Sequence, residues 1–217
     1  MMQSVRAVYK REMKSYFVSP VAYVVLTIVF IIAGVFFYLG VKGTRDANVS
    51  NVLSNLAVIF LFLSPFVTMR LLAEEKNTGT LELLLTSPVT PFQVVLGKYL
   101  AAFSIMLVAI AGTLVYVVLL LFHSSIELGP LVAGYLGLIF LSLSYIGVGM
   151  IASAVAESQI VAGILGFGAS VLLMLVHSAF GEALRQISPI FHYIEFSAGV
   201  FDVKHVVYFL LWAVFCL

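Results

Sequence analysis

The sequence approaches one nucleotide-binding motif without completing it. Gly97-Lys98 would end a phosphate-binding loop of the form G-x-x-x-x-G-K-[ST], whose backbone amides and lysine hold ATP phosphates. Phe92 stands where that loop needs its first glycine, and Tyr99 stands where it needs serine or threonine. We therefore expect this chain to bind no ATP itself and to have no ATPase site.

Other catalytic chemistry lacks residues at the required spacing. No G-x-S-x-G motif supports a serine protease. Proton-coupled transport uses ionisable residues near the middle of membrane spans, but Glu157 falls at a turn and His177 near the end of a span. The histidines follow no metal-ligand spacing and are His123, His177, His192 and His205. We expect neither a catalytic residue nor a metal site.

The composition is that of a membrane protein. Hydrophobic residues make up 63% of the chain and charged residues 10%, and the mean hydropathy is +1.17. Several apolar stretches reach the roughly 20 residues that a helix needs to cross hydrocarbon, and none alternates like a barrel strand. No basic patch supports a nucleic-acid partner, and the single cysteine, Cys216, excludes an internal disulfide. We predict an all-α polytopic protein of the lipid bilayer.

We expect about six transmembrane helices, which form a single domain over residues 20–217. The last apolar run is shorter than a span and has no polar flank, so we expect the sixth helix to be truncated. The expected spans cover residues 21–41, 52–72, 94–121, 131–155, 159–179 and 205 onward.

Residues 1–19 are expected to form an amphipathic helix that lies in the membrane interface. Ser19-Pro20 then ends this helix and begins the first span. Lysine and arginine are enriched on the cytoplasmic side of membranes, and a cytoplasmic N-terminus places seven of the eleven there. We therefore predict that the N-terminus is cytoplasmic. The residues of interest in this helix are Arg6, Lys10, Arg11, Lys14 and Phe17.

Two connections between the expected spans are too long to be simple turns. Residues 73–93 are cytoplasmic and polar, whereas residues 180–204 are external and mix polar with apolar residues. A helix restarts at Thr90-Pro91, where the Gln93 side chain is placed to bond back in a capping box. The segment 73–93 is either an ordinary loop on the membrane surface or a docking element for a cytoplasmic partner.

Two blocks of the sequence resemble the membrane permease subunits of ABC-2 type ATP-driven transporters, and most of all the gliding-motility-associated permease subunit and its relatives. The first block is residues 10–20 (KREMKSYFVSP), followed by Ala22-Tyr23-Val24. The second block contains Met69-Arg70, Glu74-Glu75-Lys76, residues 79–88 (GTLELLLTSP) and Gly97-Lys98-Tyr99. The number of spans and the long external connection extend the likeness over essentially the whole chain.

This resemblance implies a transport subunit of the bacterial inner membrane that has no ATPase site of its own. ATP and Mg²⁺ would be bound by a separate cytoplasmic ATP-binding subunit, present in two copies. The permease would form a homodimer or pair with a related permease, and an auxiliary membrane protein is a further candidate partner. It would export or flip a substrate, which the sequence does not identify, along a path at the dimer interface.

The resemblance also assigns roles to segments. The N-terminal helix through Phe17 resembles the connecting helix beside the ATP-binding subunit, and residues 74–86 resemble the coupling helix inserted into it. Residues 188–195 resemble a re-entrant hairpin that closes the outer end of the path. The implied coupling residues are Glu74, Glu75, Gly79, Thr80, Leu81, Glu82, Leu84, Leu85 and Pro88. The implied hairpin residues are Ser188, Pro189, Phe191 and Glu195.

Two other functions stay open at the level of sequence. One is a membrane scaffold that docks a cytoplasmic partner without transport; the other is an ion-coupled carrier, which the lack of charges at span centres disfavours. Small residues in the later spans allow helices to approach closely, either within one subunit or between two. These residues are Gly134, Gly137, Gly147, Gly149, Ser153, Gly163, Gly166 and Gly168.

Overall fold

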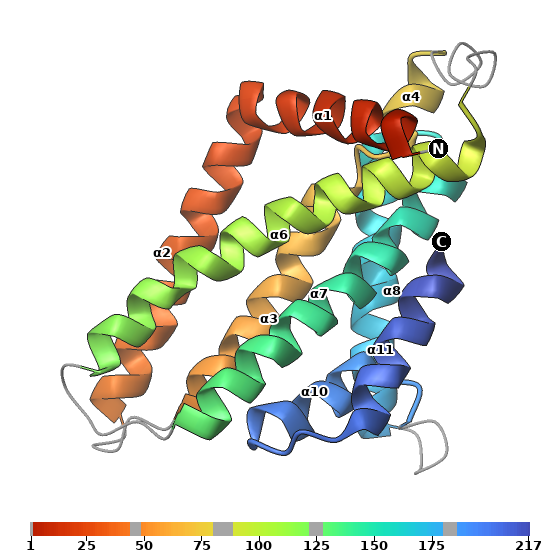
Figure 1. Ribbon diagram of the computed structural model, residues 1–217. Helices are drawn as coiled ribbons and strands as arrows, with labels where there is room; N and C mark the ends of the chain where they lie inside the picture. The colour runs from red at the N-terminus through yellow and green to blue at the C-terminus, as the bar shows by residue number, and fades with distance from the viewer. Residues whose placement is uncertain (1, 44–48, 80–88, 122–127, 180–185) are drawn as a thin grey trace.

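The computed structural model describes residues 2–43, 49–79, 89–121, 128–179 and 186–217, and every regular element in these ranges is an α-helix (Figure 1). The helices are α1 (Met2–Val18), α2 (Pro20–Gly43), α3 (Val49–Thr68), α4 (Ala73–Asn77), α6 (Pro91–Leu121), α7 (Leu128–Val155), α8 (Gln159–Ala179), α10 (Pro189–Ser197) and α11 (Val203–Cys216). The prediction of an all-α polytopic membrane protein is confirmed.

Five helices in the described ranges, α2, α3, α6, α7 and α8, are long and apolar enough to cross a membrane. They coincide with the first five expected spans, and the sixth corresponds to α11, an apolar helix of 14 residues. The second candidate span runs over Val52–Asn77 and so covers the expected residues 52–72, although the helix α3 within it ends at Thr68. A turn over residues 69–72 follows, and the backbone amides of Leu72 and Ala73 both donate to a side chain of α7.

The bundle has two distinct ends. At one end, α1 lies across the long helices beside α4, and at the other end lie α10 and the start of α11 (Figure 1). Helix α7 runs through the middle and packs against α3, α6, α8, α10 and α11. Its residues Leu138, Leu141 and Tyr145 are fully buried or nearly so. The other helices are therefore arranged around α7.

Close packing around α7 depends on glycines. A Cβ atom at Gly134 would overlap the side chain of Leu53, and a Cβ at Gly149 would overlap that of Thr68. By contrast, a Cβ at Gly168 of α8 would meet no atom within 4 Å. Gly134 and Gly149 thus let α7 approach α3 within one subunit, which is the first of the two uses expected for the small residues.

A proline inside α3 is compensated by its neighbour. Pro65 has no backbone N–H, so the carbonyl of Leu61 loses its normal helical partner. The hydroxyl of Ser64 donates to that carbonyl instead, at 3.2 Å. Because the hydrocarbon core holds little water to solvate a free carbonyl, this bond keeps α3 compatible with a membrane span.

Replacing Gly149 should destabilise the bundle, whereas the same change at Gly168 should not. Gly149→Ala forces a methyl group against Thr68, and we expect a loss of about 1–3 kcal/mol in unfolding free energy. Gly168→Ala is the matched control, because alanine favours a helix by about 1 kcal/mol over glycine and meets open space here. Denaturation of both variants in detergent checks this, and equal stability would contradict the assigned contact.

Candidate coupling site

Helix α1 is held against the bundle by specific contacts. The buried Tyr16 hydroxyl donates to the carbonyl of Val67 in α3 at 2.6 Å, and burial raises the pKa of this phenol, so that it stays neutral. Against α6, a Cβ at Gly97 would lie 2.9 Å from Cβ of Val8, closer than real Cβ atoms approach. Gly97 therefore allows α1 and α6 to pack closely. This role accounts for the glycine, since the phosphate-binding motif around it is incomplete.

A buried lysine joins three helices beneath α1. Nζ of Lys98, in α6, lies 3.0 Å from Oε1 of Glu12 in α1 and 3.0 Å from Oε1 of Glu75 in α4. The Lys98 side chain is only 2% exposed, and those of Glu12 and Glu75 are 14% and 11% exposed. A charge withdrawn from water costs several kcal/mol unless it is paired, so these three groups require one another.

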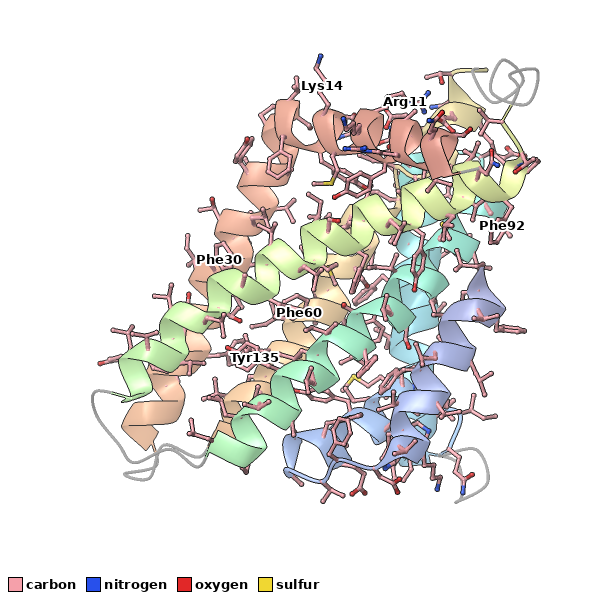
Figure 2. All side chains as sticks on the ribbon, in the orientation of Figure 1. Arg11, Lys14, Phe30, Phe60, Phe92 and Tyr135 are labelled. Carbon is pink, nitrogen blue, oxygen red and sulfur yellow. The ribbon has the colours of Figure 1, made fainter. Side chains whose placement is uncertain are left out.

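Arg11 completes this group, which we call the ion cluster (Arg11, Glu12, Glu75 and Lys98). Its Nη2 lies 2.5 Å from Oε1 of Glu75 and 3.1 Å from Oε1 of Glu12. Burial lowers the pKa of Arg11, but the two carboxylates more than offset this and raise it, so the guanidinium stays charged. Figure 2 shows Arg11 beside α4, whereas Lys14 points away from the bundle.

Helix α4 is also fixed to the end of α7. Oγ of Ser153 accepts hydrogen bonds from the backbone N–H groups of Leu72 and Ala73, at 3.0 Å each. These amides belong to the first turn of α4, where no helical carbonyl is available to them. Nζ of Lys76 donates to the carbonyl of Ala154. The short helix α4 is thus bonded to α1, α6 and α7 at the same time.

A second ion pair lies where α1, α2 and α3 meet. Nε of Arg70 lies 3.0 Å from Oε2 of Glu74, and its Nη1 donates to Oγ of Ser19 at 3.1 Å. Ser19 separates α1 from α2, so Arg70 links this junction to the segment that enters α4. The Glu74 side chain is 38% exposed, which leaves part of its carboxylate facing outward.

A sequence model of the ABC-2 family transporter proteins matches residues 39–198, which is more than half of the chain. The chain belongs to this family. No curated protein matches it significantly. As an ABC-2 family member it is a permease subunit of an ABC transporter, a transport component that pairs with an ATP-binding subunit. The match does not separate the gliding-motility-associated group from other members, so that finer assignment stays a prediction.

The ABC-2 coupling residues expected from the sequence fall into two sets. Glu75 was expected to face the ATP-binding subunit together with Glu74, but its carboxylate is buried in the ion cluster, because Lys98 and Arg11 bind it there. At the end of the bundle Gly79 is exposed, and Glu74 is partly exposed while paired with Arg70. The remaining expected residues lie outside the described residues: Thr80, Leu81, Glu82, Leu84, Leu85 and Pro88.

The segment that resembles the ABC-2 coupling helix is not one continuous helix. Helix α4 ends at Asn77, and Gly79 has a φ of +68°, a left-handed conformation that ends a helix. In the described residues the expected coupling helix therefore ends at Asn77, and its remainder, from residue 80 on, lies outside the described residues and stays a prediction. The expected restart is confirmed, since the backbone N–H of Thr90 donates to Oε1 of Gln93 at 3.2 Å and α6 begins at Pro91.

At the opposite end, the expected hairpin segment contains the short helix α10. Ser188 occupies its N-cap position, Pro189 is its first residue, and Phe191 and Glu195 are half-buried. Whether this segment re-enters the membrane stays a prediction. The helix also brings together two histidines that showed no motif in the sequence, since Nδ1 of His192 lies 2.6 Å from Nδ1 of His205.

The protonation of this histidine pair follows from its partners. Nε2 of His192 lies 2.8 Å from the carbonyl of Gln186, which can only accept, so this nitrogen carries a proton. Neutral His192 therefore accepts at Nδ1 from the Nδ1–H of His205. Burial lowers the pKa of His192; His205 and Lys204 lower it further, while the Gln186 carbonyl and Glu195 oppose the shift.

Removing the lysine of the ion cluster should destabilise the protein strongly. Lys98→Met leaves two poorly exposed carboxylates with Arg11 alone, and we expect a loss of about 3 kcal/mol, the lower end of values for broken buried pairs. Lys14→Met removes an exposed lysine of α1, at the same end of the bundle, and should change stability by under about 0.5 kcal/mol. Denaturation in detergent compares the two variants, and similar losses would exclude the cluster as a structural element.

Acidification should loosen the end that contains α10. Unfolded histidine has a pKa near about 6.5, and that of His192 is lower in the fold, so the unfolded chain takes up protons first as pH falls. The free energy of unfolding should be at its full value above the unfolded pKa of about 6.5 and should decrease as the pH falls below it. His192→Gln should flatten the dependence of the unfolding temperature on pH between about 7.5 and 5; an unchanged slope would show that other groups cause it.

Proposed function

We propose that this permease subunit receives force from an ATP-binding subunit at α4 and the segment that follows it, and exports or flips a substrate. The end of the bundle that contains α1 and α4 faces the cytoplasm in this proposal, as the distribution of lysine and arginine indicates. ATP and Mg²⁺ are bound by the partner, so this chain contributes movement and not hydrolysis.

One observation carries the proposal: a helix of five residues is bonded to three other helices. The ion cluster connects α4 to α1 and α6, and Ser153 and Lys76 connect it to α7. Displacement of α4 by a partner would break these bonds unless all three helices moved with it. The partly exposed Glu74 of this anchored helix gives the partner a charged contact.

A dimer completes the proposed transporter. Helices α2 and α8 bury little of their length within one chain, and Phe62 and Phe66 of α3 are exposed between them. We propose that this face meets a second permease subunit, in a homodimer or with a related chain, and that the path for substrate runs along it. Two permeases would then engage two ATP-binding subunits. An auxiliary membrane protein is a further candidate partner.

Charge reversal at the exposed coupling residue should weaken docking. The full chain, tagged and co-expressed with candidate ABC ATP-binding subunits, should retain one of them during purification. Glu74→Lys should reduce the retained amount several-fold, because a partly exposed anion becomes a cation. Glu195→Lys makes the same change at the opposite end of the bundle and should leave retention unaltered.

A change at Glu75, the buried neighbour of Glu74 in the chain, distinguishes docking of the ATP-binding subunit from transmission of its movement. Glu75→Gln should keep the ATP-binding subunit attached but should uncouple its hydrolysis from transport, since the ion cluster loses a charge while the surface is unchanged. If hydrolysis responds to neither Glu74→Lys nor Glu75→Gln, a non-transporting scaffold is favoured. Substrate movement driven by a proton gradient without ATP would favour an ion-coupled carrier instead.

A further inference from the structure

A groove between α1 and α6 is used by none of the contacts described above. It has a volume of about 670 Å³ and lies between the first turns of α1 and residues 96–104 of α6. Two contacts hold the helices at a fixed separation beside it: the packing of Val8 on Gly97 and a 3.0 Å hydrogen bond between the hydroxyls of Tyr9 and Ser104. The groove is therefore formed before any ligand binds.

The lining of the groove is divided chemically. Leu96, Leu100 and Phe103 of α6 make an apolar wall, and Leu100 is 39% exposed. Gln3 and Arg6 of α1 lie at the opposite side, three residues apart and so on one face of the helix. No carboxylate lines the groove, and none of the salt bridges among the described residues involves Arg6. A ligand here meets an apolar surface and a cation.

The position of the groove in the membrane narrows the choice of ligand. Helix α6 is a membrane span, and α1 crosses its end with basic residues exposed, so α1 lies at the level of lipid headgroups (Figure 1). The apolar wall is then at the level of the acyl chains directly beneath. A phospholipid has this same order of charge and apolar chain, and an anionic headgroup complements Arg6.

We propose that the α1–α6 groove is a binding site for one anionic phospholipid. The phosphate lies against Arg6 and Gln3, and an acyl chain follows Leu96, Leu100 and Phe103. The volume is within the roughly 300–1,000 Å³ of ligand sites in proteins. The bound lipid would fill the space beside α1 and so stabilise its packing on α6. This site does not depend on the proposed transport function.

Lipid-dependent stability of the full chain tests the proposal. The purified, delipidated protein in detergent is titrated with dioleoyl phosphatidylglycerol or dioleoyl phosphatidylcholine, and its unfolding temperature is followed. Phosphatidylglycerol should stabilise at lower concentration than phosphatidylcholine. Arg6→Gln should weaken the apparent affinity for phosphatidylglycerol about fivefold and abolish the difference between the lipids. Leu100→Asp should weaken binding of both, because a carboxylate then lies in the path of the chain.

A matched control and two further outcomes decide between occupants. Lys14→Gln removes the same charge from an α1 position outside the groove and should leave both affinities unaltered. An equal loss in this variant would overturn the proposal in favour of diffuse attraction to the membrane. Equal stabilisation by glycerol 3-phosphate would show a soluble phosphate site. If Arg6→Gln reduces only retention of the ATP-binding subunit, the groove is a protein contact.

Discussion

The arrangement of the coupling end depends on one buried charge. Lys98 can remain at 2% exposure only while carboxylates from two other helices face it, since the cost of an unpaired ion there exceeds most single interactions in the fold. Helices α1, α4 and α6 are therefore held together because their buried charges must stay paired, and not only because their side chains pack. The apolar helices alone could slide within lipid, where burial gives them little preference for one neighbour over another.

Much of the fold could be predicted from the sequence because the bilayer imposes simple rules. Stretches of about 20 apolar residues gave five spans, and the capping box at Thr90 and Gln93 is local chemistry that needs no tertiary information. Residues 74–86 were expected as a coupling helix because the sequence around them resembles that of ABC-2 permease subunits. In the described residues α4 ends at Asn77 and Gly79 has a positive φ, a local conformation that a resemblance in sequence does not indicate.

The sequence predicted which segments form the site but not the ion pairs within it, because the paired residues lie far apart along the chain. Glu12 and Lys98 are separated by 86 residues, so their pairing depends on how three helices are placed, which no local pattern contains. Glu75 was assigned to the ATP-binding subunit by the family resemblance, which does not contain the positions of Arg11 and Lys98 around it. His192 and His205 meet because the chain reverses at Gly199, where φ is +84°.

The junction at Ser19 has a geometric consequence for α2. This helix has 24 residues and is thus about 36 Å long, so a tilt of about 5° at Ser19 displaces its far end by about 3 Å. Arg70 holds the pivot, and α6 blocks motion on one side, because Phe30 already packs where Gly112 has no side chain. A small rotation of α1 would therefore be magnified at the far end of α2, and moving that end away from α6 would require breaking the hydrogen bond from the Tyr116 hydroxyl to the Phe30 carbonyl.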